Sequence, residues 1–438
     1  MRDFLPEDVR RREYVVGTVR NVYDRYGFEP LETPAAENIG TLLGKYGDEG
    51  NKLIFKILRR GEHEASGQAD LALRYDLTVP LARVVAEYQS KLPRFFKRYQ
   101  IQPVWRADRP ARGRFREFYQ CDIDSVGSAS PVVEAEQITA VSEILATLGF
   151  DDFVVRINHR KFLAAWLIRI GVSGDRHGDV LFTIDKVDKI GRDGVAKELA
   201  EKGYGPAQID GICGWIGASH PPDWLDSMAG EFTGEGHAAL ENLRRICQLA
   251  APVTAAGQLR IDPALARGLG YYTGAIMEIN VKDLAGSIAG GGRYDNLIGM
   301  FSGGDVPACG FSLGLERILV VMQERGMFPP HVEQSAVDVV VAAMDEAAQP
   351  AAMAAAAELR KERLRVDLYP DATRKMDRIF KHVDQRKARF IAILGSDEVA
   401  AGTVTLRNVA AKTKETMPRS ESAQYIARAL SDGRDQGA

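Results

Sequence analysis

The sequence predicts an α+β body built on a central antiparallel sheet, a helical insertion within that body, and a smaller α/β domain at its C-terminal end. Three observations predict this class. Residues 94–126 read as two strands joined by a long polar loop. Residues from about 160 to 260 are mostly helical in pattern, and strand-like sequence returns only after them. Beyond residue 336, short apolar strands alternate with helical segments, which is typical of an α/β domain.

Length, composition and charge are those of an ordinary globular protein of several domains. The 438 residues are 45% hydrophobic and 27% charged, and a domain averages about 150 residues. A formal net charge of -3 excludes a uniformly basic protein, so a polyanionic partner would need a local basic patch. No apolar run approaches the ~20 residues that span a bilayer, and residues 1–13 contain no apolar signal region. We therefore expect a cytoplasmic protein.

The chain opens with a predicted helix. Pro6 lies at its start and Gly27 just after its end, which is the usual punctuation of a helix. Its apolar residues recur at helical spacing: Val15, Val19, Val22 and Tyr26.

Strands and helices then follow in blocks. The segments RFFKRYQIQPVW and REFYQCDIDSV are aromatic and β-branched, and they flank the polar loop ADRPARGRF, so they predict two antiparallel strands. Helical stretches such as KFLAAWLIRIGV and HAALENLRRICQLA fill residues 160–260. YYTGAIMEINV predicts a strand, the glycine cluster SIAGGGRYD follows, and GFSLGLERILVVMQERG predicts a glycine-led helix. A strand-rich body interrupted by helices indicates an inserted domain.

The Pro329-Pro330 pair marks the best linker candidate. Beyond it, AVDVVVAAM, RVDLYP and RFIAILG predict three strands separated by helices, one of them an Ala-rich segment near 351–363. This alternation predicts a mostly parallel sheet. Eleven Lys or Arg residues fall between Arg360 and Arg389. A solvated surface and a set of RNA phosphate contacts would both account for them.

Several familiar kinds of site are excluded by their missing motifs. A P-loop needs Ser or Thr after its Gly-Lys pair, whereas Tyr46 follows Gly44-Lys45. The segment GLGYYTG at 268–274 precedes a strand, whereas a dinucleotide fingerprint opens a helix. The seven histidines show no metal-ligand spacing, and no G-x-S-x-G elbow is present. The four cysteines are too scattered for a disulfide scaffold or a zinc knuckle.

The predicted hairpin carries most of the chemical signal. Nine Lys or Arg residues and one acidic residue lie between Lys91 and Arg116, interleaved with aromatic residues. Such a run is often only a solvated face, but its loop concentrates cations suited to phosphates: Arg109, Arg112 and Arg114. On the returning strand the period of two places Gln120, Asp122 and Asp124 on one face. This polar stripe would suit either solvent or a polar ligand pocket.

The same residues carry a resemblance to a known family. Over essentially its whole length the chain resembles the histidyl-tRNA synthetases, which are class II aminoacyl-tRNA synthetases. VWRADRPARGRFREFYQ at 104–120 looks like motif 2, GFSLGLERI at 310–318 looks like motif 3, and GFEPLETPAAE at 27–37 is a looser match to the dimer-interface motif 1. LARGLGYYTG at 265–274 resembles the signature of the histidine enzymes, and LRYDLTVP at 73–80 resembles their substrate loop.

The resemblance implies an organisation and a reaction. A class II catalytic domain would occupy residues 1–160 and 259–328, with a helical insertion at 161–258, a linker at 329–335 and an anticodon-binding domain at 336–438. The reaction would activate L-histidine with ATP to histidyl-adenylate and transfer it to the 3′ end of tRNA-His, releasing AMP and diphosphate. Mg²⁺ is expected on the phosphates, with protein ligands that the sequence does not identify. A homodimer is expected as well.

The resemblance also implies residue roles. Arg106 and Arg267 would be catalytic, both at the α-phosphate. The expected ATP-binding residues are Arg106, Arg114, Phe118 and Arg317. The expected histidine-binding residues are Asp76, Thr78 and Gln120 at the α-ammonium group, and Asp124, Tyr271 and Tyr272 at the imidazole. Attack of a carboxylate on a phosphate joins two anions, which is why cations are the main requirement of this chemistry.

Two positions depart from the family pattern. Relatives commonly have Asp where this chain has Gly270, so an orienting side-chain hydrogen bond there must be missing or replaced. Some bacterial relatives have Gln where this chain has Ala111, in a loop used near the extra 5′ guanosine of tRNA-His.

Two other functions are compatible with this resemblance. One is the histidine-sensing regulatory subunit of ATP phosphoribosyltransferase, which lacks the last domain and has a degraded histidine signature. The other is the tRNA-sensing domain of a stress kinase, although the chain has no kinase signature.

Overall fold

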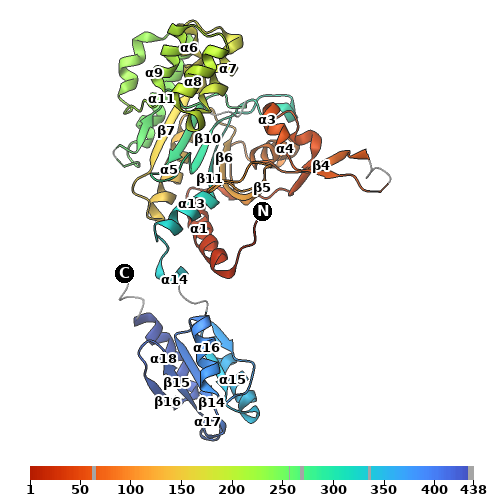
Figure 1. Ribbon diagram of the computed structural model, residues 1–438, viewed down its shortest axis with the longest axis vertical. Coiled ribbons are helices and arrows are strands. Elements are labelled where there is room, and N and C mark those ends of the chain that lie inside the picture. Colours follow the sequence, from red (N-terminus) through yellow and green to blue (C-terminus); the bar gives the residue numbers. More distant parts are fainter. Residues whose placement is uncertain (62–65, 256, 267–270, 334–336, 433–438) are drawn as a thin grey trace. The chain divides into compact units, whose positions relative to one another are not determined.

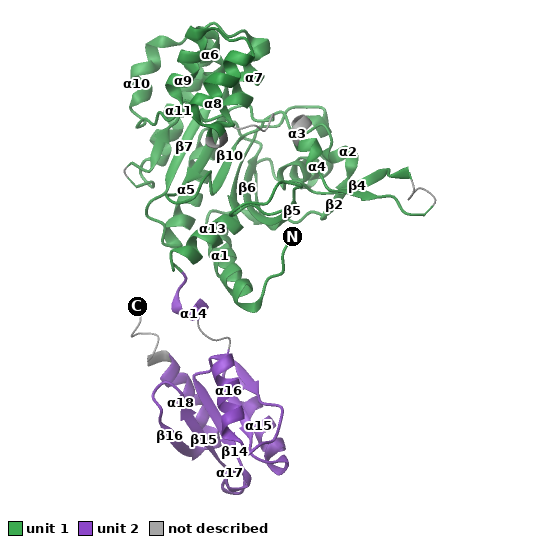
Figure 2. Cartoon of the chain, viewed as in Figure 1, with its two compact units in different colours: residues 1–327 green, residues 328–438 purple. Residues whose placement is uncertain are grey.

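The computed structural model describes residues 1–61, 66–255, 257–266, 271–333 and 337–432. The chain forms two compact units, Met1–Met327 and Phe328–Ala438 (Figure 1, Figure 2). Each unit has a sheet of its own and a separate hydrophobic core. Of the helices that the structure describes, none combines the length and the apolar character needed to cross a membrane.

The first unit is built on an eight-stranded sheet whose centre is antiparallel. Its strand order is β1-β5-β6-β11-β10-β9-β7-β8. In that order the strands are Glu29–Pro30, Phe96–Trp105, Glu117–Val126, Ala308–Gly314, Ala289–Arg293, Ala275–Asn280, Val154–His159 and Leu259–Ile261. The predicted antiparallel sheet is confirmed for the six central strands, whereas the edge pairs β1·β5 and β7·β8 are parallel.

The β5–β6 hairpin confirms the predicted strand–loop–strand. Its register runs without a shift from Phe96 opposite Val126 to Trp105 opposite Glu117. Strand β6 lies inside the sheet and not at its edge, because it pairs with β5 on one side and with β11 on the other. The polar stripe of β6 is therefore held between two neighbouring strands.

The helices that contact the central strands β6 or β11 include α1 (Pro6–Arg25), α5 (Val132–Thr147) and α13 (Leu315–Glu324). The predicted first helix is confirmed, and its buried residues are Val15, Val19, Val22 and Tyr23. Tyr26 lies just beyond the helix and is partly exposed, with its hydroxyl donating to Glu143 over 2.8 Å. The buried face of the helix therefore contains Tyr23 in place of the predicted Tyr26.

The glycine-rich segments differ from the sequence-based expectation. Residues 289–293 form the central strand β10, for which the sequence predicted no strand, and residues 308–314 form β11, so helix α13 begins only at Leu315. The reason is close packing of backbones, because a Cβ at Gly291 would lie 2.0 Å from the carbonyl oxygen of Gly310. Glycine here serves a tight strand contact rather than a loop.

Short elements flank the sheet near one end of β5. A three-stranded sheet consists of β2 (Ala36–Asn38), β4 (Ala69–Leu73) and β3 (Lys56–Leu58). The neighbouring helices are α2 (Ile39–Leu42), α3 (Gly47–Lys52), α4 (Thr78–Tyr88) and α12 (Gly299–Ser302). Helix α4 contacts both α2 and α12.

Six helices lie between β7 and β8 in the sequence and form one end of the first unit (Figure 1). They are α6 (Arg160–Arg169), α7 (His177–Ile184), α8 (Val187–Glu201), α9 (Pro206–Trp215), α10 (Trp224–Met228) and α11 (Gly234–Ala250). Their shared core includes Leu163, Val180 and Leu199.

The second unit is a five-stranded sheet with helices. After α14 (Pro330–Glu333), its elements are β12 (Val339–Ala343), α15 (Gln349–Lys361), β13 (Val366–Leu368), α16 (Met376–Arg386), β14 (Phe390–Leu394), α17 (Ser396–Ala401), β15 (Thr403–Asn408), β16 (Lys414–Pro418) and α18 (Arg419–Asp432). The three predicted strands pair in parallel in the order β13-β12-β14. The expectation of a mostly parallel sheet is wrong, because β15 and β16, which were not predicted, extend the sheet with antiparallel pairs.

Candidate active site

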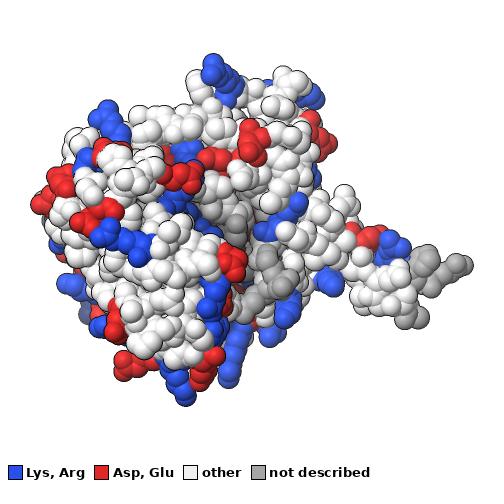
Figure 3. Space-filling model, turned by 90° about the horizontal axis from the view of Figure 1, so that it is seen from above, with Lys and Arg blue, Asp and Glu red and all other residues white. Residues whose placement is uncertain are grey.

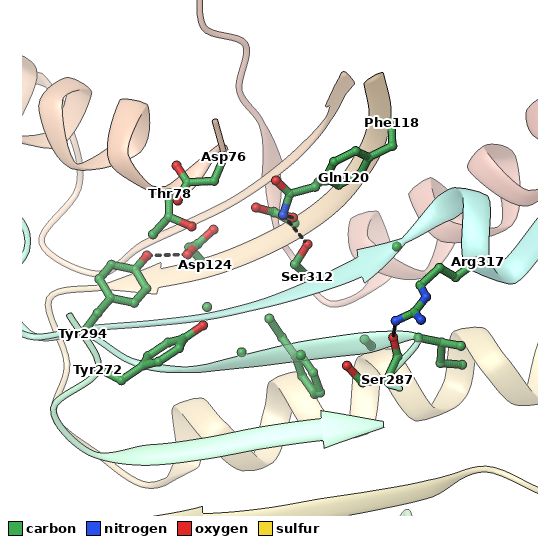
Figure 4. Close-up of a pocket in the computed structure, with 18 of the residues that line it drawn as sticks. Asp76, Thr78, Phe118, Gln120, Asp124, Tyr272, Ser287, Tyr294, Ser312 and Arg317 are labelled. Carbon is green, nitrogen blue, oxygen red and sulfur yellow. Dashed lines mark hydrogen bonds between the residues drawn. The ribbon is translucent and has the colours of Figure 1, made fainter. Parts of the chain in front are cut away.

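A pocket of about 280 Å³ opens on the sheet between β6, β10, β11 and the start of α4 (Figure 4). The structure brings together in this one pocket ten of the residues for which the sequence predicts a role: Asp76, Thr78, Arg106, Arg114, Phe118, Gln120, Asp124, Tyr271, Tyr272 and Arg317. The eleventh, Arg267, lies outside the described residues, as does Gly270.

The loop before α4 supplies the first carboxylate. Asp76 is 2% exposed, and its Oδ1 accepts hydrogen bonds from the backbone N–H of Val79 (3.1 Å) and from the hydroxyl of Tyr46 (3.0 Å). Its Oδ2 is buried and has no hydrogen-bond partner among the described residues. Burial raises the pKa of Asp76, although these hydrogen bonds and Arg106 oppose the rise. The orphaned oxygen is the feature that a bound cation would satisfy.

Strand β6 supplies a second unsatisfied acceptor. The amide nitrogen of Gln120 donates to the hydroxyl of Ser312 on β11 over 2.8 Å, which orients the side chain. Its amide oxygen, Oε1, is buried and lacks a partner within the described part of the chain. Asp76 Oδ2 and Gln120 Oε1 line the same pocket together with the hydroxyl-bearing Thr78. Such a set of oxygen acceptors suits a substituted ammonium ion.

Asp124 lies further along the same face of β6. Its carboxylate forms a 2.6 Å ion pair with Arg98 on β5, and it accepts a hydrogen bond from the hydroxyl of Tyr294. Burial raises the pKa of Asp124 to about 6, although Arg98 and Tyr294 both lower it. The carboxylate is therefore firmly oriented and faces the pocket beside Tyr272 (Figure 4).

The signature tyrosines complete this end of the pocket. The rings of Tyr271 and Tyr272 pack edge to face, with their centroids 5.0 Å apart. Burial raises the pKa of Tyr271 well above its ordinary value, so its hydroxyl stays protonated and can donate at neutral pH. The backbone N–H of the next residue, Thr273, donates to the carbonyl of Arg293 over 2.8 Å and ties the tyrosines to β10.

Guanidinium groups line the pocket as well. Arg106 follows β5, donates from Nε to the carbonyl of Tyr75 over 2.9 Å, and holds its guanidinium 4.3 Å from the Tyr75 ring and 5.1 Å from the Phe118 ring. Arg317, in the first turn of α13, donates from Nη2 to the carbonyl of Ala285 over 2.6 Å. Figure 4 shows Arg317 and Phe118 at one end of the pocket and Asp76 and Asp124 at the other.

The loop of the hairpin closes over Arg317 by a tight turn. Ala111 and Arg114 exchange backbone hydrogen bonds of 3.1 and 2.9 Å, so Ala111 contributes backbone geometry to this turn. Gly113 has a φ of +67°, and a Cβ there would lie 3.3 Å from Cγ of Arg317. The turn therefore favours glycine for its left-handed backbone, and the loop lies close to Arg317.

Sequence reasoning assigned no role to several lining residues. Asp122 is 2% exposed, and burial raises its pKa to about 7. The alternation of β6 had already placed it on the face of Gln120 and Asp124, so the signal was present. Ser312 lines the pocket as well and lies within the motif 3-like segment, so its neighbourhood was signalled, whereas Tyr294 and Ser287 lie beside the glycine-rich strand β10, which carries no local sign of a site.

The chain is similar to known protein families and known proteins over both of its units. A family model described as histidyl-tRNA synthetase matches residues 1–318, and one described as an anticodon binding domain matches residues 338–429. The protein named histidine–tRNA ligase of Gloeobacter violaceus is 40% identical over 453 residues, which cover 97% of this chain and 97% of that protein. The one of Christiangramia forsetii is 40% identical over 435 residues, covering 93% and 94%.

A solved structure of the same family is similar to this chain as well. The crystal structure of histidyl-tRNA synthetase from Nostoc sp. PCC 7120 superposes with a TM-score of 0.81 at 30% identity, covering 98% of this chain and 97% of that one. The matches extend over both units, including the family model for the second. The chain belongs to the histidyl-tRNA synthetase family.

Proposed function

We propose that this chain activates L-histidine with ATP to histidyl-adenylate and transfers the histidyl group to the 3′ end of tRNA-His, releasing AMP and diphosphate. The observation that carries the proposal is the combination of acidic and cationic groups in one pocket. Orphaned acceptor oxygens and oriented carboxylates line it together with three guanidinium groups: Arg106, Arg114 and Arg317. An amino acid with a cationic amine and a polar ring suits the acidic groups, and a polyphosphate suits the guanidinium groups, of which Arg317 lies away from Asp76 and Asp124 (Figure 4).

The histidine substrate would bind to the acidic groups. Its α-ammonium group would donate to Asp76 Oδ2, Gln120 Oε1 and the hydroxyl of Thr78, which removes the cost of burying those oxygens unpaired. Its imidazole would lie between Asp124 and Tyr272, with Tyr271 nearby. A site built from buried polar groups rejects analogues that lack the matching polar atoms by about 10⁴-fold or more.

ATP would bind to the guanidinium groups. Phe118 would stack on the adenine, while Arg114 and Arg317 would hold the base and the outer phosphates. In the first step a carboxylate oxygen of histidine bonds to the α-phosphorus as the bond to diphosphate breaks. Arg106 and Arg267 would neutralise the charge that accumulates there, which is the largest contribution a site of this kind makes. In the second step a 3′-terminal hydroxyl of tRNA attacks the carbonyl carbon, its proton is released, and AMP leaves.

We also propose that Mg²⁺ accompanies the nucleotide. Among the described residues there is no cluster of three His, Cys, Asp or Glu side chains that could hold a metal ion. Phosphate oxygens and water would therefore provide most of its ligands, as is usual for this ion. Chelation with EDTA should abolish exchange, and excess Mg²⁺ should restore it.

The remaining assignments concern tRNA, assembly and location. We propose that residues 336–438 bind the anticodon and that the insertion, residues 161–258, clamps the acceptor stem. Crosslinks from bound tRNA should fall in both segments, and their absence from 161–258 would contradict the clamp. We further propose a cytoplasmic homodimer with residues 27–37 at its interface, which sedimentation velocity and mutation of that segment would test.

Exchange of labelled diphosphate into ATP tests the reaction directly. The assay uses the full chain, each of the twenty amino acids in turn, and no tRNA. We expect exchange with histidine alone, followed by charging of tRNA-His. Exchange with another amino acid would contradict the assigned specificity. Histidine binding without any exchange would favour a regulatory role, and co-purification with a phosphoribosyltransferase would then support it.

A further inference from the structure

The buried guanidinium of Arg98 connects the two halves of the proposed histidine site. Arg98 lies on β5 directly opposite Asp124 on β6, and its side chain is 0% exposed. Its Nη2 lies 2.6 Å from Asp124 Oδ2 and also donates to the carbonyl of Leu77 over 3.2 Å. Leu77 is the residue between Asp76 and Thr78, so one guanidinium reaches both the imidazole side and the ammonium side.

Arg98 does not line the pocket itself. Its second nitrogen, Nη1, donates to Gln100 over 3.3 Å, and the amide of Gln100 donates in turn to Thr33 over 2.9 Å. These buried hydrogen bonds hold the guanidinium of Arg98 in place. A fully buried, oriented cation of this kind acts on its neighbours rather than on a ligand.

The charges around the pocket explain why a cation is needed there. Asp76, Asp122 and Asp124 are each at most 2% exposed and line the same pocket. Like charges in a desolvated space favour protonation, and a protonated carboxyl would present a donor where an acceptor is needed. Arg98 opposes that change at Asp124, and removing one partner of a buried ion pair leaves an uncompensated charge.

We propose that Arg98 is a positioning residue for histidine recognition, which keeps Asp124 ionised and sets its place relative to the Asp76–Thr78 loop. The inference rests on the proposed function, because it assumes that this pocket end binds histidine. The proposal predicts a defect in the binding of histidine and not in the binding of ATP. Arg98→Met should weaken histidine binding about 10- to 100-fold, the range expected for loss of one hydrogen bond to a charged group. Its KM for ATP should stay near the wild-type value.

The test measures the Kd for histidine by calorimetry and the KM values for histidine and ATP by exchange. Arg98→Lys retains a cation and should recover most of the affinity, and it serves as the readable variant if Arg98→Met fails to fold. Histidinol, which keeps the amine and the imidazole but lacks the carboxylate, should lose affinity by the same factor as histidine. An equal loss for ATP would overturn the proposal.

Arg325→Met provides a matched control. Arg325 also pairs with a carboxylate, because it donates to Asp152 over 2.9 and 2.8 Å, but neither of these two residues lines the pocket. It should lower the melting temperature with a much smaller change in the Kd for histidine. If both variants weaken histidine binding equally, Arg98 acts only through stability and the proposal is wrong.

A double-mutant cycle gives the sharpest outcome. If Arg98 acts through Asp124, then Arg98→Met added to Asp124→Ala should change the Kd for histidine little further, whereas independent effects would multiply. A wild-type protein that binds histidine without exchange would contradict the proposed reaction, and the Kd comparison would still decide the role of Arg98. A wild-type protein that binds no histidine would overturn both.

Discussion

Gly310→Ala is the substitution that most directly tests the placement of Asp124. Gly310 on β11 lies opposite Asp124 on β6, and a Cβ there would lie 2.0 Å from Oδ1 and 2.8 Å from Cγ of that carboxylate. Non-bonded atoms do not approach so closely, so the side chain of Asp124 must rotate away. It would then lose Arg98 and Tyr294 as partners.

The size of the effect follows from those contacts. A hydrogen bond to a charged group contributes about 1.5–3 kcal/mol, and about 1.4 kcal/mol corresponds to a tenfold change in an equilibrium constant. If Asp124 binds the imidazole as proposed, displacing its carboxylate should therefore raise the Kd and KM for histidine about 10- to 100-fold. The KM for ATP should change little, because Phe118 and Arg317 lie at the other end of the pocket (Figure 4).

The assay is diphosphate exchange over a histidine series and an ATP series, with calorimetric histidine binding and thermal unfolding. Gly17→Ala is the control, because a Cβ at this position of helix α1 would meet no atom within 4 Å apart from the neighbouring residues and backbone of the helix itself. It should keep both KM values and add about 0.5–1 kcal/mol of stability. A folded Gly310→Ala variant with wild-type histidine affinity would refute the reasoning, because Asp124 would then not contact the substrate.

Two further predictions concern other parts of the site. Arg267→Ala should leave the fold intact and lower adenylation about 10²-fold or more, as loss of one transition-state contact does; near wild-type turnover would contradict the role of Arg267. Burial raises the pKa of Glu316 to about 7, so the folded state binds its proton more tightly than the unfolded chain. That stabilisation is complete below about pH 4.5 and is lost as the pH rises through about 7. Glu316→Gln does not titrate and lacks this loss. Its free energy of unfolding in urea, relative to that of the wild type, should therefore rise by on the order of 2–3 kcal/mol between pH 5 and pH 8. A difference that stays constant with pH would contradict the titration.

The charged surface shows why net charge alone says little about tRNA binding. On the face drawn in Figure 3, Lys and Arg side chains are interspersed with Asp and Glu side chains. The formal net charge of -3 agrees with such a mixture. Any tRNA contact on that face would therefore depend on the placement of individual cations, not on a uniformly positive field.

The sequence by itself determined the features that depend on local periodicity and punctuation. The first helix, the β5–β6 hairpin and the strands β12, β13 and β14 were predictable because spacing, turn residues and β-branched composition act over a few residues. The polar face of β6 follows from its period of two, which places Gln120, Asp122 and Asp124 together without further information. The family motifs added the remaining site residues that the structure gathers in one pocket.

Only the tertiary structure decided how these residues meet and what surrounds them. The glycine strand β10 forms because β9 and β11 approach it closely, and no local propensity predicts a strand there. The orphaned oxygens of Asp76 and Gln120 and the buried cation of Arg98 depend on desolvation, which is a property of packing. Segments far apart in the chain supply them, so their distances, partners and pKa values exist only once the sheet has formed.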